Sequence, residues 1–319
     1  MNNFIGICKM TQPEVKAYMK QYLTDLNYDV IDEDGFLYAK GDVPVLLVAH
    51  MDTVHQKQCT EVNMTDGKLS SPQGIGGDDR CGVYIISQIV KEKHCSVLLC
   101  EDEEKGGIGA RKFTKTDYIN NLDVSYMIEF DRKGSSDAVF YSCDNAEFTD
   151  FVCDATGFKE AHGSFSDISV LMPAAKIAGV NLSSGYYNAH TTSEYVVPSD
   201  MEMTIEMAMV LIECECPDPF EYVEKKYDYS KWPNRNSGSR WGSSNYQYNF
   251  FDAGMWQPKE MSDIALDDLD IELEVLVPDE TERERAVCVS GKTKTECWMK
   301  FFLENPDYSF NDITTYSWS

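Results

Sequence analysis

The sequence predicts an α/β fold in which helices cover both faces of a mixed, mainly parallel, twisted sheet. Three apolar runs, at residues 43–48, 96–101 and 126–130, have the length and aliphatic content of buried strands. Helices are expected between and after them, among them residues 83–91 and 201–214, the latter with apolar residues at helical spacing. Strands that alternate with helices in this way are typical of a mainly parallel sheet.

The first part of the chain is predicted to form one helix and two hairpins. The helix covers residues 11–26, because Thr11 can cap it, a proline follows in the first turn and a glutamate stands at the third position. Residues 28–40 read as a hairpin around an Asp-Glu-Asp-Gly turn that leads into the strand at 43–48. A second hairpin is expected around the Thr-Asp-Gly sequence at 65–67.

The later elements continue the alternation of strands and helices. A glycine-rich loop at 74–82 is expected to open the helix at 83–91. Two more helices are predicted at 107–113 and 144–154, and an extended segment at 175–181. These elements complete a sheet that is covered on both sides.

Composition divides the 319 residues into three predicted parts. Residues 1–216 contain the strands and helices above and form one α/β domain, whose end is marked by Pro217 and Pro219. Residues 217–262 are rich in serine, asparagine and aromatic residues, which suits a linker or an arm. Residues 263–319 are predicted to be a small acidic module, in which apolar residues that alternate with acidic ones indicate a half-buried strand.

The charge and the cysteines restrict the partners and the compartment. A net charge of -26 disfavours nucleic acids and anionic membranes, because both repel an acidic protein. No apolar stretch approaches the roughly 20 residues that span a bilayer, and the first ten residues lack the pattern of a signal peptide. The eleven cysteines include no Cys-x-x-Cys pair, and several lie in apolar runs. We therefore expect a reducing, cytoplasmic location.

Residues that can bind or catalyse follow the predicted strands. His50 and Asp52 come directly after the strand at 43–48, at the carboxyl edge where open α/β sheets bind their ligands. Side chains two residues apart on an extended segment face the same way, so Asp52 is placed to orient His50. Four further segments bring acids or a histidine to expected strand ends or loops, at residues 78–79, 102–104, 129–131 and 188–194.

Taken singly, each of these segments has a simpler interpretation. Asp78 and Asp79 alone are compatible with a helix cap, Glu103 and Glu104 with a solvated pair, and His190 with a hydrogen-bonded surface residue. Together they provide two histidines and several carboxylates, a ligand set that suits zinc, with manganese or cobalt as alternatives. Clustered carboxylates raise one another's pKa values unless cations are present. Two metal ions that share a bridging carboxylate can activate one water molecule.

The order of these segments resembles that of the co-catalytic di-zinc exopeptidases, which include the leucyl-type and tetrahedral aminopeptidases and peptidase T-like and carboxypeptidase relatives. Their pattern is His-x-Asp, then Asp-Asp-x-x-Gly, then Asp-Glu-Glu-x-Gly-Gly-x-Gly-Ala, then an acid, then a histidine. The sequence matches this pattern in order, over about residues 40–215, at 50–52, 78–82, 102–110, Asp131 and His190.

The resemblance implies a set of metal ligands. His50 would bind one metal ion and His190 the other, and Asp78 would bridge the two. Glu104 would ligate one ion and Asp131 the other. The peptide bond after the residue that corresponds to Asp78 is cis in the relatives.

The resemblance also implies two catalytic roles. Glu103 would be the general base that takes a proton from water and gives it to the leaving amine. Asp52 would stand behind His50 and fix its orientation. Glu129 is the alternative to Asp131 as a ligand, because both lie at one strand end and face the same way.

Two departures from the relatives concern inserted domains. Only 58 residues separate Asp131 from His190, too few for the lid domain of the carboxypeptidase and peptidase T-like relatives. Only 27 residues separate His50 from Asp78, too few for the second domain of the tetrahedral aminopeptidases. The resemblance therefore implies a single-domain catalytic core without a lid, and the substrate-binding residues of the relatives cannot be transferred.

The resemblance implies a metallohydrolase that cleaves a terminal peptide bond, first of all an aminopeptidase acting on short peptides, with two divalent ions as cofactors. A deacylase or amidohydrolase that acts on N-acyl amino acids with the same site is an alternative. A non-catalytic interaction protein on the same fold is an alternative of another class. Association of identical chains is left open.

Overall fold

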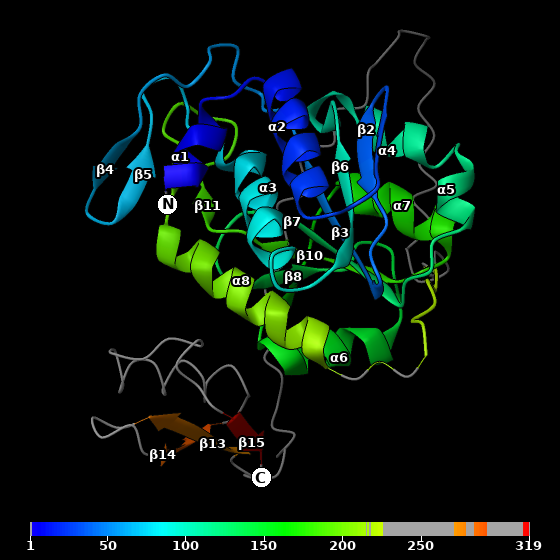
Figure 1. Cartoon of the computed structure of the whole chain (residues 1–319), viewed down its shortest axis with the longest axis vertical. Helices are drawn as coiled ribbons and strands as arrows, with labels where there is room; N and C mark the ends of the chain where they lie inside the picture. The colour runs from blue at the N-terminus through cyan, green and yellow to red at the C-terminus, as the bar shows by residue number, and fades with distance from the viewer. Residues whose placement is uncertain are drawn as a thin grey trace, which may run out of the picture. The chain divides into compact units, whose positions relative to one another are not determined.

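The computed structural model describes residues 2–214, 216, 218–225, 271–278, 284–291 and 315–318. Residues 2–225 form an α/β unit (Figure 1). Three strands nearer the carboxyl end, β13 (Ile271–Pro278), β14 (Glu284–Gly291) and β15 (Thr315–Trp318), form a small antiparallel sheet in the order β14-β13-β15. The half-buried strand predicted in the acidic module corresponds to β13. Most of the predicted linker at 217–262 lies outside the described residues.

The α/β unit contains eight α-helices within its described residues. They are α1 (Asn2–Cys8), α2 (Gln12–Asp25), α3 (Gly77–Ile89), α4 (Ile108–Phe113), α5 (Asp117–Asn120), α6 (Ala146–Thr156), α7 (Asp167–Ala175) and α8 (Pro198–Glu213). Helix α2 begins as predicted, with Thr11 as its cap: the Thr11 amide donates to Glu14 Oε2 at 2.8 Å, which forms a capping box.

Eight strands form the main sheet of this unit, in the order β1-β2-β6-β3-β7-β10-β8-β9. The four central strands β6, β3, β7 and β10 are parallel, and β1, β2 and β8 join them in antiparallel pairings. The predicted mixed, mainly parallel sheet is confirmed. The strands are β1 (Val30–Glu33), β2 (Phe36–Ala39), β3 (Val43–His50), β6 (Cys95–Cys100), β7 (Tyr126–Arg132), β8 (Asp137–Val139), β9 (Lys159–Ala161) and β10 (Gly179–Ser183).

Helices cover both faces of the main sheet. Helix α3 lies in the connection from β3 to β6, whereas α7 precedes β10, a strand on the other side of β3 in the sheet. Because these two connections cross the sheet in opposite directions, right-handed crossovers place the two helices on opposite faces. Helices α1 and α8 contact α3, whereas α4 and α5 contact α7 (Figure 1). From β3 the chain adds β6 on one side, and β7 and β10 are added later on the other side. Such a reversal of strand order is the switch point at which open α/β sheets bind ligands.

The core lies between the central strands and these helices. All six residues of β6 are buried, as are the last six of β3. Cys95 and Cys100 are fully buried in β6, and burial raises the pKa of Cys95 to about 12, so its thiol stays protonated. These two cysteines therefore serve as small apolar core residues.

Two expectations about secondary structure were wrong. Residues 175–181 are not extended throughout, because α7 continues to Ala175 and β10 begins only at Gly179. Helix α7, which contains Pro173, was not among the expected elements. Helix α3 begins at Gly77 and not at residue 83, with Asp78 and Asp79 in non-helical conformations at its start.

A second sheet of four short strands joins the segment before α3 to the segment after β10. Its order is β11-β12-β5-β4, with β4 (Asn63–Thr65), β5 (Lys68–Ser70), β11 (Tyr186–Tyr187) and β12 (Tyr195–Val196). The β4–β5 hairpin is the one predicted around the Thr-Asp-Gly turn. No lid domain separates Asp131 from His190: the chain between them forms strands and helices of the two sheets and their cover.

The described chain continues past the predicted domain boundary. Glu221 and Glu224 form isolated β-bridges with Ile177 and Cys143, and Phe220 packs its ring against Phe148. Among the described residues, no helix is both long and apolar enough to cross a membrane.

Glu206, half-buried on α8, makes stability depend on pH. Burial and then the nearby Glu202 raise its pKa from 4.5 to about 7. Between these pH values the folded protein holds a proton that the unfolded chain releases, so ionisation of Glu206 destabilises the fold as the pH rises. We predict that Glu206→Gln and wild type have similar melting temperatures at pH 4, and that the variant melts higher at pH 8. The exposed Glu160→Gln is the control. An equal difference at both pH values would contradict the prediction.

Candidate metal centre

The predicted ligands and catalytic residues converge at the carboxyl edge of the main sheet. Three neighbouring strands supply some of them, β3 at its end, β7 near its end and β6 through the 3-10 turn Glu103–Lys105 that follows it. The others come from the start of α3 and from the loop between β11 and β12. The convergent residues are His50, Asp52, Asp78, Glu103, Glu104, Asp131 and His190.

Asp78 lies between two groups of potential ligands. Its Oδ1 is 3.1 Å from His50 Nε2, and its Oδ2 is 3.1 Å from His190 Nε2. Asp131 Oδ1 lies 3.6 Å from His50 Nε2, and Glu104 Oε1 lies 3.1 Å from His190 Nε2. The arrangement therefore consists of a His50–Asp131 pair and a His190–Glu104 pair, with one carboxylate oxygen of Asp78 facing each histidine.

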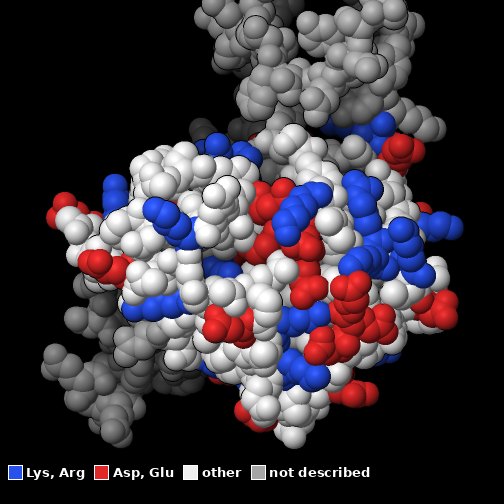
Figure 2. Space-filling model, turned by 90° about the horizontal axis from the view of Figure 1, so that it is seen from above, with Lys and Arg blue, Asp and Glu red and all other residues white. Residues whose placement is uncertain are grey.

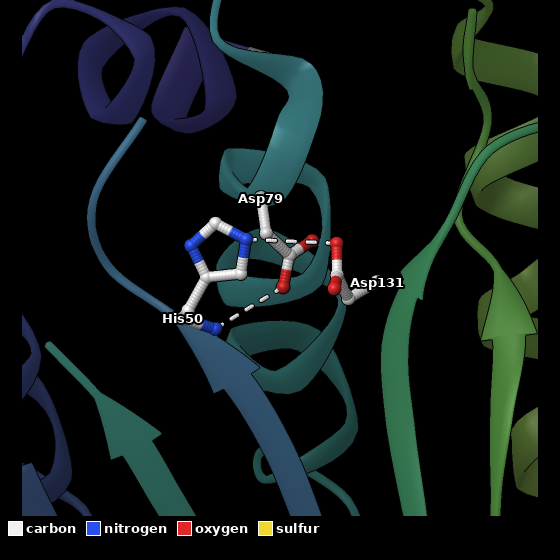
Figure 3. Close-up of side chains that lie close together, drawn as sticks. All are labelled: His50, Asp79 and Asp131. Carbon is white, nitrogen blue, oxygen red and sulfur yellow. Dashed lines mark hydrogen bonds and ion pairs between the residues drawn. The ribbon is translucent and has the colours of Figure 1, made fainter. Parts of the chain in front are cut away.

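Asp79 fixes the backbone around this arrangement (Figure 3). Its buried carboxylate accepts hydrogen bonds from the His50 amide at 3.2 Å and from the Gly82 amide at 2.8 Å. A side chain at position 82 would collide with that carboxylate, which explains the glycine. Burial and the nearby Asp131 raise the pKa of Asp79 well above its ordinary value. The peptide bond between Asp78 and Asp79 is cis.

Asp52 organises the neighbouring residues. Its Oδ1 and Oδ2 accept hydrogen bonds from the amides of Glu103 and Glu104, at 3.0 and 3.2 Å. Its Oδ1 also lies 3.2 Å from His50 Nδ1. Because a carboxylate only accepts, Nδ1 of His50 donates to Asp52, and this contact turns Nε2 towards Asp78, where a bound cation would take the place of its proton. One side chain thus sets the tautomer of a ligand and the position of the Glu103–Glu104 turn.

The carboxylates crowd one another in the protein without bound cations. Burial raises the pKa of Glu103 to about 8 and that of Glu104 to about 7, and nearby carboxylates add to both shifts. Burial and Asp78 raise the pKa of Asp131 to about 6. Cations would relieve this repulsion. The buried Glu104 Oε1 lies 3.1 Å from His190 Nε2 but has no hydrogen-bond partner within the described part of the chain. The donor set therefore fits two divalent ions.

Acidic and basic side chains both lie on the face at the strand ends. Figure 2 views the molecule from the side of these strand ends, and red acidic side chains gather near the middle of this face, with Lys and Arg around them. A cavity of about 700 Å³ adjoins the site at Asp52 and Glu104. Its walls come from the chain after β3, the link between α1 and α2, and the glycine turn before α3, at residues 53–59, 8–12 and 74–76. Its volume is typical of a small-molecule site.

The contacts of Glu129 and Asp131 differ although both side chains leave the same face of β7. Glu129 is buried and accepts hydrogen bonds from the Ser166 hydroxyl at 2.5 Å and from the Ile168 amide at 3.2 Å. Asp131 Oδ2 also lies 3.0 Å from the Ser166 hydroxyl, but the other oxygen of Asp131 faces His50. This geometry favours Asp131 as the ligand and gives Glu129 the role of anchoring α7.

Sequence reasoning gave no role to three residues that support the site. Asp79 and Arg80 stand beside Asp78 in the recognised motif, and Glu194 follows His190 by four residues, so proximity was the available signal. Arg80 is buried and donates to the carbonyls of Met51 and Met10, the latter at 3.0 Å. Burial lowers its pKa to about 10, which still leaves it charged at neutral pH.

We predict that metal content separates Asp131 from Glu129. Asp131→Asn should lower the metal bound at saturation by about one ion per chain, because one position loses a charged ligand. Glu129→Gln should keep the wild-type content, because the amide oxygen can still accept from Ile168. Elemental analysis after dialysis against zinc measures both. The opposite ranking would make Glu129 the ligand.

No family model matches the chain, and no curated protein matches it in sequence. Solved structures do match the fold. The aminopeptidase PepT from Bacillus cereus ATCC 10987 superposes with a TM-score of 0.54 and 16% identity, over 66% of this chain and 96% of that one. Aminopeptidase APDkam598 from the archaeon Desulfurococcus kamchatkensis gives 0.51 and 14%, over 66% and 95%. PhTET1-12s, a dodecamer, gives 0.50 and 14%, over 66% and 98%. The chain therefore shares the α/β fold of these solved structures, two of which are aminopeptidases.

Proposed function

We propose that this protein is a di-metal exopeptidase, an aminopeptidase that removes the first residue of short peptides. One observation carries the proposal: Asp78 presents one carboxylate oxygen to His50 and the other to His190, each 3.1 Å away. A carboxylate that divides its oxygens between two histidines is placed to bridge two metal ions. The aminopeptidases of the same fold support the assignment to peptide-bond hydrolysis.

In this proposal His50 and Asp131 hold one ion, His190 and Glu104 hold the other, and Asp78 is shared. Zinc suits nitrogen and carboxylate ligands, and manganese and cobalt are the alternatives. Such ions, when bound, polarise the scissile carbonyl and lower the pKa of the attacking water.

Glu103 is the proposed general base. It follows β6 directly, and its side chain is buried beside the ligands. Asp52 holds its amide, which fixes where the carboxylate can lie. Glu103 takes a proton from the attacking water and gives it to the departing amine, so a single carboxyl group serves both halves of the reaction.

The charge of the site indicates which end of a peptide substrate it binds. Glu103, Glu104 and Asp131 lie together at the site, and acidic side chains gather near the middle of the face that Figure 2 shows. A positively charged amino terminus suits such surroundings better than the carboxylate of an N-acyl amino acid. The cavity beside Glu104 offers room for further residues of a short peptide. A cytoplasmic location belongs to the same proposal and is supported by the buried thiols of β6.

We predict that Glu103→Ala lowers kcat by about 10²- to 10⁴-fold, the usual contribution of a general base. Its metal content should stay at the wild-type value, since Glu103 is not among the proposed ligands. The exposed Glu92→Ala is the matched control. Turnover close to wild type in Glu103→Ala would remove Glu103 from this role.

A panel of substrates decides which bond is cleaved. Aminoacyl fluorogenic substrates, amino-blocked peptides and N-acyl amino acids are assayed with zinc, manganese and cobalt. We expect turnover only where the amino terminus is free. Turnover of N-acyl amino acids alone would make the protein a deacylase. No turnover together with less than about one ion per chain would favour an interaction protein.

A further inference from the structure

Glu194 is a fully buried carboxylate, and both of its oxygens are contacted by nitrogen donors, three in all. Its Oε2 lies 2.8 Å from His55 Nε2 and accepts from the Gly76 amide at 2.8 Å. Its Oε1 accepts from the amide of Asp78 at 3.1 Å. Because both oxygens already accept from backbone N–H groups, the carboxylate is committed to this turn and is not a spare metal ligand.

Glu194 connects two of the chain segments that carry proposed metal ligands, those of His190 and Asp78. It lies directly before β12 and four residues after His190, on the segment that supplies the second histidine. Strand β12 pairs with β5, with Tyr195 opposite Ser70, and β5 leads into the turn that carries Asp78. The side chain of Glu194 therefore joins the segment of His190 to the backbone of the bridging residue.

His55 connects a third segment, the one after β3 that carries His50 and Asp52, to the same carboxylate. It follows Asp52 by three residues, and its amide donates to Thr53 Oγ1 at 3.3 Å. Its Nε2–H donates to Glu194, because the carboxylate only accepts. The ring packs against Gly74, where any side chain would collide with it. Residues 139 apart in the sequence thus meet behind the metal centre.

We propose that Glu194 and His55 are positioning residues for the metal pair. Glu194 holds the main chain of Asp78 so that its two oxygens face His50 and His190, and the N–H of His55 holds Glu194 in place. The inference rests on the proposed metal centre, but it does not depend on which bond is cleaved. Partners behind metal ligands typically contribute 10- to 100-fold in metal affinity.

The test compares Glu194→Gln with two His55 variants. In Glu194→Gln, the charge is lost and an amide group replaces an oxygen that accepted an N–H. His55→Phe keeps a ring against Gly74 but removes the donor. His55→Gln loses the ring but restores an N–H donor. We expect about 10- to 100-fold weaker zinc binding in Glu194→Gln and His55→Phe, and recovery of most of the affinity in His55→Gln.

Zinc affinity is measured on the full chain by competition with a chelating dye. The absorption spectrum of the cobalt-loaded protein is a second readout, because a displaced bridging carboxylate changes the coordination. The exposed Glu202→Gln and His162→Phe are the matched controls and should bind zinc as the wild type does. The unfolding of each metal-free variant is recorded alongside.

Three outcomes are informative. Wild-type affinity in both Glu194→Gln and His55→Phe overturns the proposal. Higher affinity in His55→Phe than in His55→Gln also overturns it, because packing of the ring would then be what matters. If Glu194→Gln does not fold, the ranking of the two His55 variants still decides. A wild-type protein that binds no zinc refutes the metal centre itself, which is a different result from a variant that binds as well as wild type.

Discussion

Repulsion between buried carboxylates is the constraint on which this structure depends. Glu103, Glu104 and Asp131 are gathered around Asp78 at the edge of the sheet, and burial raises the pKa values of the first three. Such a cluster is unfavourable unless cations compensate it. The ligands of such a preformed site are already held close together. Relief of their repulsion therefore contributes part of the free energy of metal binding.

Backbone amides hold the acids in place against this repulsion. Asp52 accepts from the amides of the Glu103 turn, Asp79 from the amide of His50, and Glu194 from the amide of Asp78. Each of these carboxylates ties a different chain segment to the centre, while the ligand oxygens face inward. The site therefore consists of an inner group that would meet the ions and an outer group of acids that accept hydrogen bonds from backbone N–H groups.

Much of the fold could be predicted because its signals are local. The apolar run that ends at His50 marks a buried strand, and Thr11 marks the start of α2. The ligand segments could be placed at one edge because the carboxyl ends of parallel strands meet there. The choice between Asp131 and Glu129 could not be made, since both face the same side of β7 and the hydrogen bonds of Glu129 to α7 distinguish them. The contact of His55 with Glu194 was also out of reach, because it depends on how two distant loops pack.

Arg80 connects the amino-terminal segment to the sheet edge that carries the candidate ligands. Its guanidinium donates hydrogen bonds to the carbonyl of Met10, between the first two helices, and to the carbonyl of Met51, between His50 and Asp52. A shift of the chain near Met10 is therefore passed to the end of β3 through a single rigid, planar group. Substitutions near Met10 can therefore shift the sheet edge at the candidate site, while every proposed ligand stays the same.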